Sequence, residues 1–268
     1  MKLSIKLWGG MLCAMLAALA QEAPAQDVRQ IVQQAVNAEL AANHDDNSHW
    51  RYLRTEAGGN SMIVVETENG AISRKVQENG RPASVQTLAE EDQHNQKFIH
   101  DPEEQKKQRA NGSHDDKSAV ELLNLLPQAF VWKVESETPA ETTLHFDPDP
   151  NFHPPDMDAR VMGEMSGTMV VERKQHRIRT FKGMLGSDVT LGFGLLARIK
   201  QGSTFDVERR QVAAGYWEIT ETHVHISGHA LFFKTIGEQE DEVKTEFTLV
   251  PLGTTLEQAV GLLKAAAK

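Results

Sequence analysis

The sequence predicts an α+β protein built around one long, curved antiparallel β-sheet. Two observations in the stretch from Arg160 to Val250 predict the sheet. Hydrophobic and polar residues alternate there with a period of two, most clearly in Val243–Val250, as in half-buried strands. Glycines punctuate the stretch at intervals that a strand can fill. The connections are too short for crossover helices, so consecutive strands are expected to form a meander.

Residues 1–25 have the pattern of a secretory signal peptide. Lys2 and Lys6 precede an apolar run from Leu7 to Ala20, and small residues offer cleavage sites near Ala20 and Ala25. The run is too short for a membrane-spanning helix, and no second hydrophobic stretch follows. We therefore expect a periplasmic or secreted protein without a stable transmembrane anchor after cleavage. An uncleaved N-terminal anchor is the alternative.

Cysteine content and charge restrict what the exported chain can do. Cys13 is the only cysteine and follows Leu12, where a lipoprotein signal would need a small residue. Residues 26–268 must then fold without disulfides, as a single domain with neither an internal repeat nor a long linker. The net charge is −10, and removal of residues 1–25 would make it more negative. Such a charge argues against nucleic acid and anionic membranes as partners.

The first elements are a helix and a hairpin. Asp27 is expected to cap an amphipathic helix whose apolar residues share one face. These residues are Val28, Ile31, Val32, Ala35, Val36 and Leu40. Farther on, Ser61–Glu68 and Ala71–Gln77 flank Asn69-Gly70, the strongest hairpin signal in the chain.

A charged helical insertion is predicted around residues 87–117. Thr87 and Glu90 form a capping box, and the helix is expected to break near Asp101-Pro102. A second capping box, Ser118 with Glu121, predicts a short apolar helix that ends at Pro127. Strands are expected at 130–136 and 141–146, and a final helix is expected to begin at Thr254 with Glu257 three residues later.

The order of these elements resembles that of bacterial periplasmic lipoprotein carriers and outer-membrane lipoprotein-sorting proteins. The local pattern Gly163-Glu164-Met165-Ser166-Gly167-Thr168-Met169-Val170-Val171-Glu172, followed by Ile178, is similar to a strand pair of that superfamily. The resemblance implies an incomplete barrel with helices packed on its concave face and acyl chains bound between them. The charged insertion and the C-terminal helix depart from the pattern of that superfamily.

The first functional hypothesis is therefore a carrier or sensor for a lipid or a lipidated protein. Methionine and aromatic side chains adapt well to an acyl chain in an apolar cavity. The candidate ligand-binding residues are Met165, Met169, Phe205, Trp217, Phe233 and Phe247. The alternative is that these residues form a closed core and that the protein is an envelope interaction module whose acidic insertion docks a partner.

A third hypothesis is a metal-dependent hydrolase. His223, His225 and His229 are the candidate metal ligands, and Glu221 offers a fourth. On a strand, His223 and His225 project from the same face, a geometry that zinc and copper sites use. Their spacing matches no recognised zinc pattern, and we predict neither a cofactor nor a catalytic residue. An enzyme is not excluded, and the ligand and the oligomeric state stay open.

Overall fold

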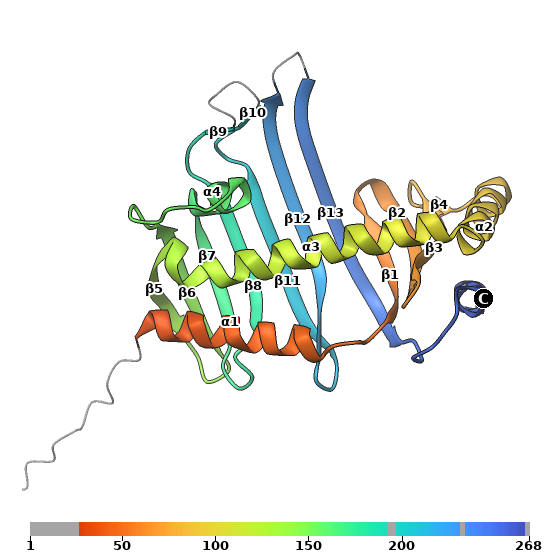
Figure 1. The fold of residues 1–268 in the computed structure, drawn as a ribbon, viewed down its shortest axis with the longest axis horizontal. Helices are drawn as coiled ribbons and strands as arrows, with labels where there is room; N and C mark the ends of the chain where they lie inside the picture. The colour runs from red at the N-terminus through yellow and green to blue at the C-terminus, as the bar shows by residue number, and fades with distance from the viewer. Residues whose placement is uncertain (1–26, 192–196, 231–233, 266–268) are drawn as a thin grey trace, which may run out of the picture.

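The computed structural model describes residues 27–191, 197–230 and 234–265 (Figure 1). The predicted signal peptide and Cys13 lie outside these residues. The helices are α1 (Val28–Asp45), α2 (Val85–Ile99), α3 (Pro102–Ala129), α4 (Met157–Gly163) and α5 (Leu256–Ala265), with a 3-10 turn at Ala57–Gly59. The strands are β1 (Trp50–Glu56), β2 (Asn60–Thr67), β3 (Gly70–Glu78), β4 (Arg81–Pro82), β5 (Phe130–Glu137), β6 (Glu141–Pro148), β7 (Met165–Glu172), β8 (Ile178–Leu185), β9 (Val189–Leu191), β10 (Ala197–Ile199), β11 (Thr204–Ala213), β12 (Tyr216–Ala230) and β13 (Lys234–Leu249).

All strands belong to one antiparallel sheet. Its order is β4-β3-β2-β1-β13-β12-β11-β8-β7-β6-β5, and the β9–β10 hairpin joins it through β12. The sheet does not close, because β4 and β5 lie at opposite ends of this order. From β5 to β13 the chain forms the expected meander, and β13 then pairs with β1. The predicted fold class, α+β with an open antiparallel sheet, is confirmed.

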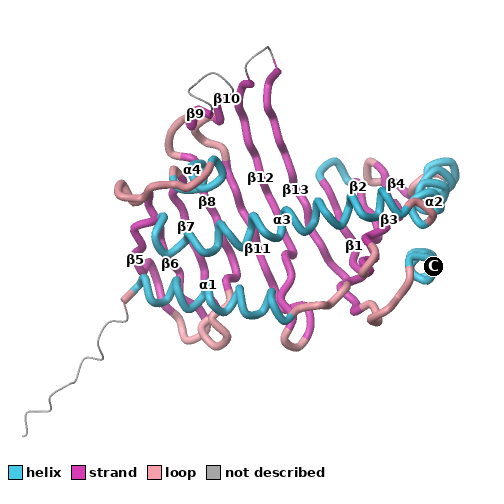
Figure 2. Tube along the Cα trace, in the orientation of Figure 1, coloured by secondary structure: helices cyan, strands magenta, loops and turns pink. Residues whose placement is uncertain are grey.

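Two long helices cross one face of the sheet, which we call the inner face (Figures 1 and 2). α1 buries the apolar stripe expected from the sequence, with Val32, Ala35 and Val36 fully buried. They pack in the main core with Phe146 of β6 and Met169 of β7. The apolar side of α1 and the alternating strands thus fix the helix on the sheet.

The opposite face, here the outer face, carries its own helices at the β1–β4 end. Ile63 and Val65 of β2 pack with α2 and α5, whereas Val64 between them packs with Trp50 and Tyr52. Successive strand residues point to opposite faces, so this end of the sheet has apolar clusters on both sides. The prediction placed the helices on one face; α1 and α3 lie there, but α2 and α5 do not.

The predicted charged insertion is part of the packed structure along one edge. Asn95 of α2 is buried and donates to the Ser73 carbonyl oxygen at 2.8 Å. On α3, the Gln108 side chain bonds both the N–H and the carbonyl oxygen of Ala71. The helix therefore starts against the β2–β3 hairpin before it crosses the inner face.

α3 is longer than predicted. The break before it is confirmed, because Asp101 caps the helix by accepting from the N–H groups of Glu103 and Glu104. The predicted start of a separate helix at Ser118 is wrong, because Ser118 lies inside one continuous helix, and Pro127 is in its last turn. Residues of high helix propensity fill the first turns of α3, Glu103 to Ala110, but its exposed middle, Asn111 to Asp116, has residues of low propensity and gives no helical signal in the sequence. The apolar period that marks a helix starts only near its end.

Three other boundaries are corrected. Ser84, not Thr87, caps α2, and Thr255 with Gln258, not Thr254 with Glu257, forms the capping box of α5. The stretch that begins at Arg160 was expected to be a strand, but it starts with α4, capped by Asp156. Hydrophobic spacing over so few residues fits either structure.

Gly228 is one of the glycines that punctuate the stretch from Arg160 to Val250 and that were expected at hairpin ends or bulges, but it lies within β12. A Cβ atom at this position would come 2.4 Å from the carbonyl oxygen of Arg198 on β10. The glycine thus permits close approach of the β9–β10 hairpin and does not mark a turn.

Candidate functional site

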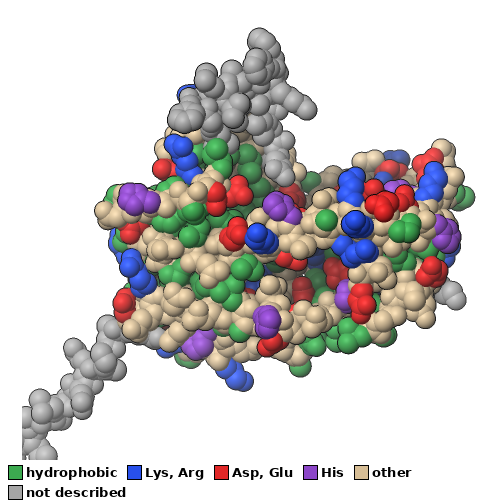
Figure 3. Space-filling model, in the orientation of Figure 1, with side chains coloured by type: hydrophobic (Ala, Val, Ile, Leu, Met, Phe, Trp, Pro, Cys, Tyr) green, Lys and Arg blue, Asp and Glu red, His purple; other side chains and the backbone are tan. Residues whose placement is uncertain are grey.

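A cavity of about 870 Å³ lies between the inner face of the sheet and helices α1, α3 and α4. Apolar side chains from each layer line it, including Leu123 of α3, Met162 of α4 and Val224 of β12. In the space-filling view, hydrophobic side chains show between α1 and α3, and the surface is hollowed beside the middle of α3 (Figure 3). Its volume and lining are those of a site for a small apolar ligand.

The structure brings three of the six predicted ligand-binding residues to this cavity. Met165, Phe205 and Trp217 line it, and Phe205 keeps 39% of its surface exposed. Met169 is fully buried in the main core. Along β7 it faces the inner side as predicted, but α1 and its neighbours cover it completely.

Phe247, another of the predicted residues, lies away from the cavity. Phe247 packs on the rings of Trp50 and Tyr52, with ring centroids 6.0 Å and 5.4 Å apart. It belongs to a separate cluster at the β1–β13 junction. Phe233 lies outside the described residues.

A buried carboxylate forms part of the cavity wall. Glu39 of α1 is 4% exposed. It accepts hydrogen bonds from the backbone N–H of Ile178 at 2.7 Å and from Arg177 Nη2 at 2.9 Å. Arg209 Nη1 of β11 donates to the same Glu39 oxygen as Arg177. All three charged residues line the cavity. This Glu39–Arg177–Arg209 cluster ties α1 to two strands.

Trp217 completes this end of the cavity. The Arg177 guanidinium lies over the indole at 5.8 Å from the ring centroid, a cation–π arrangement. Arg209 Nη2 donates to the Trp217 carbonyl oxygen at 3.0 Å. Arg177 Nε is buried and has no hydrogen-bond partner among the described residues. The cluster therefore keeps an unused donor beside an apolar space.

Acidic side chains lie near the same end. Burial, with the charges of Glu66 and Asp46 as smaller causes, raises the pKa of Glu218 to about 7. Burial likewise raises the pKa of Glu66, which accepts from the Trp50 N–H at 3.0 Å. The pKa of the Tyr52 hydroxyl is also raised by burial. Of these groups only Glu218 lines the cavity.

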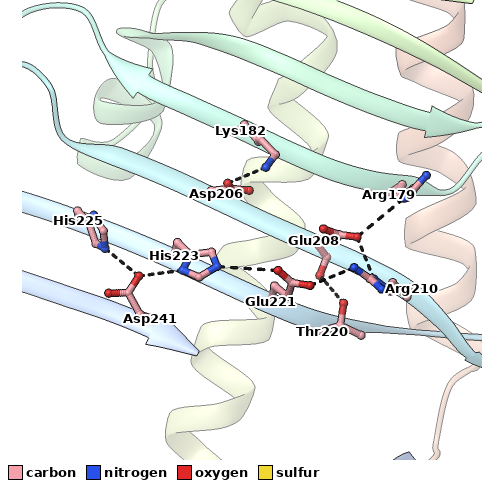
Figure 4. Close-up of polar contacts among 10 residues, drawn as sticks. All are labelled: Arg179, Lys182, Asp206, Glu208, Arg210, Thr220, Glu221, His223, His225 and Asp241. Atoms are coloured by element: carbon pink, nitrogen blue, oxygen red, sulfur yellow. Dashed lines mark hydrogen bonds and ion pairs between the residues drawn. The ribbon is translucent and has the colours of Figure 1, made fainter. Parts of the chain in front are cut away.

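The predicted histidine cluster lies on the other face. His223 Nδ1 and His225 Nε2 lie 2.8 Å and 2.9 Å from the same oxygen of Asp241 (Figure 4). These contacts lower the pKa of Asp241 to about 2. The side chain of His229 is not described. Within the part of the chain that the structure describes, no group of three or more His, Cys, Asp or Glu side chains is arranged to hold a metal ion.

Ion pairs continue across the outer face from these histidines. Lys182 pairs with Asp206, and Glu208 pairs with Arg179 and Arg210 (Figure 4). Asp206 and Glu208 alternate along β11 with side chains that line the cavity, so they point away from it. The outer face of these strands is thus a network of paired charges, while the inner face is mostly apolar apart from Arg209 and Glu218.

Sequence reasoning missed the Glu39–Arg177–Arg209 cluster, although one signal was present. Glu39 follows Val32, Ala35 and Val36 at helical spacing, so it sits on the apolar stripe of α1. A carboxylate on a buried face requires a cationic partner. Nothing in the sequence indicated which of the arginines would supply it.

No family model, curated protein or solved structure matches the chain. The resemblance to lipoprotein carriers therefore stays a prediction. Among the described residues, none of the helices is both long and apolar enough to cross a membrane.

Proposed function

We propose that the protein binds an acyl chain, of a lipid or of a lipidated partner, in the cavity on the inner face, and acts as a carrier or sensor in the cell envelope. The observation that carries the proposal is the apolar cavity of about 870 Å³. Phe205 and Ile219 line it and remain 39% and 40% exposed. An acyl chain would remove such surfaces from water, which is the main driving force for this kind of binding.

Two experiments on the purified protein test the proposal. The first is calorimetric titration with fatty alcohols of increasing length, below their aggregation concentration. Each methylene that enters the cavity contributes about 0.8 kcal/mol, so affinity should rise about fourfold per carbon until the cavity is full and then level off. The second is mass spectrometry of the protein from its native host, which should find a co-purified lipid.

A cavity-filling substitution provides the matched test. Val224→Trp places an indole in the cavity, whereas Val134→Trp places one on the exposed part of β5. The first variant should lose binding and the second should keep it. Urea unfolding monitors the fold of both, and Val207→Trp repeats the test at a second lining position. Equal binding by all of these variants, with intact folding, would contradict the proposal.

The two other hypotheses have less support. The interaction module rested on a closed core, but the inner face encloses a cavity. The hydrolase rested on three histidines, and the two whose side chains are described are bonded to Asp241 on the outer face.

A further inference from the structure

The charged end of the cavity carries more positive than negative charge in its buried cluster. Arg177 and Arg209 share one carboxylate, that of Glu39. Both oxygens of Glu39 are already in use, because they accept from the Ile178 N–H and from the two guanidinium groups. Each guanidinium has five N–H donors, so the pair keeps hydrogen-bonding capacity that Glu39 does not satisfy.

The unused donors of Arg177 and Arg209 are important because the two side chains are largely shielded from water, which would otherwise accept their hydrogen bonds. The side chain of Arg177 is 9% exposed, and its Nε has no hydrogen-bond partner among the described residues. The side chain of Arg209 is 22% exposed, which leaves it reachable from the cavity. A buried cation with an unpaired donor favours an additional anionic acceptor. Arg209 is therefore the group that a ligand would meet first, with Arg177 behind it.

The Glu39–Arg177–Arg209 cluster lies at one end of the cavity, and apolar side chains line the cavity from there along β11. Along β11, Arg209 is five residues from Thr204, which spans about 17 Å of extended strand. Ile199 and Ile226 line the cavity toward the Thr204 end. A molecule with one charged group and one long chain matches this arrangement.

Carboxylates near the opening do not cancel the effect. Asp45, Asp46, Asp116 and Asp158 line the cavity at exposed positions, where solvent and salt screen them. Glu218 also lines the cavity and interacts electrostatically with Arg209, but its pKa of about 7 leaves it partly protonated near neutral pH. Charges inside the cavity act through a lower dielectric than those at its rim, so the arginines dominate there.

We propose that Arg209 and Arg177 bind the anionic group of a single-chain amphiphile, a carboxylate or a phosphate, while its acyl chain extends toward Ile226. This inference rests on the proposed acyl-chain function. Guanidinium groups suit both anions, because their planar donors can bond two oxygens at once.

The test compares ligands with one chain and different head groups. Palmitate, hexadecyl phosphate, hexadecanol and hexadecyltrimethylammonium are titrated separately into the wild-type protein. Palmitate or hexadecyl phosphate should bind at least about tenfold more tightly than hexadecanol. The ratio of the two anionic ligands distinguishes a free fatty acid from a lipid phosphate. Equal affinity for palmitate, hexadecyl phosphate and hexadecanol would overturn the head-group site and leave acyl binding standing.

Variants assign the effect to the cluster. Arg209→Gln should weaken binding of the anionic ligands about tenfold and change hexadecanol by no more than about twofold. Arg209→Lys should restore part of the loss. Arg210→Gln, the neighbour that points to the outer face, is the matched control and should change nothing.

Other outcomes are equally informative. If Arg209→Gln weakens hexadecanol as much as palmitate, the head-group site is refuted. Tighter binding of the cationic amphiphile would also refute it and assign the charged end to Asp45 and Asp46. Binding of none of the four ligands would refute the acyl-chain function itself. The wild-type comparison needs no substitution and so is independent of any effect on folding.

Discussion

Removal of the Glu39 carboxylate should cost the protein a large part of its stability. Glu39→Ala leaves Arg177, which has a 9% exposed side chain, without its anionic partner in the interior. It also leaves the Ile178 N–H without its acceptor. Breaking a buried ion pair from one side typically costs about 3–5 kcal/mol. We expect a loss in that range in the free energy of unfolding.

Urea unfolding followed by circular dichroism measures this loss. With a denaturant slope near 3 kcal/mol per molar, the midpoint should fall by about 1–2 M. Glu135→Ala, on an exposed position of β5, is the control and should stay within about 0.5 kcal/mol of wild type. A loss below about 1 kcal/mol for Glu39→Ala would refute the reasoning, because it would mean that the pair is not desolvated in solution.

A companion variant separates unpaired charge from lost helix packing. Glu39→Met combined with Arg177→Met and Arg209→Met replaces the whole cluster with apolar side chains. Such replacements are often neutral or stabilising, so most of the stability should return. If the triple variant is as unstable as Glu39→Ala, the loss comes from packing and not from charge.

Three further predictions concern pH and glycines. The pKa of Glu218 is raised to about 7 in the folded protein, so its contribution to stability is present below about pH 4.5 and is lost as pH rises through 7. Between pH 5 and 8, the free energy of unfolding of Glu218→Gln should therefore gain on the order of 2 kcal/mol relative to wild type. The same pH dependence for both proteins in urea unfolding would contradict this prediction. Gly112→Ala, in the exposed middle of α3 with no atom of another element within 4 Å of the new Cβ, should raise stability by about 0.5–1 kcal/mol in urea, and no gain would indicate that this part of α3 is frayed. Gly167→Ala would bring a Cβ 1.8 Å from the carbonyl oxygen of Lys182, so it should destabilise by more than about 2 kcal/mol in the same assay; a neutral result would show that β7 and β8 are farther apart in solution.

Much of the fold could be predicted because its signals are local. The stripe on α1, the Asn69-Gly70 hairpin and the Asp101-Pro102 break each depend on residues close in sequence, and each is confirmed. The open antiparallel sheet followed from alternation and short connections. Two predictions that were wrong also have a physical cause. The middle of α3 buries few side chains, so the sequence shows no helical period of apolar residues there. Gly228 is required by the close approach of Arg198 on β10, a contact that local sequence does not reveal.

The candidate site was harder to predict than the fold. Met165, Phe205 and Trp217 line the cavity because strand alternation places them on the inner face. The same alternation could not separate a cavity wall from a sealed core, as Met169 shows. The Glu39–Arg177–Arg209 cluster joins residues more than 130 positions apart, and no local pattern encodes such a contact.

The pairing of β1 with β13 has a consequence for how the chain acquires its structure. Trp50 lies opposite Leu249, so the strand that completes the middle of the sheet is the last one to be synthesised. Closing so long a loop is entropically costly and slow, and until it happens both β1 and β13 present open edges to other chains. We expect the N-terminal hairpin and the meander that ends in β13 to form early as separate units, with the pairing of β1 and β13 as the last and slowest step of folding.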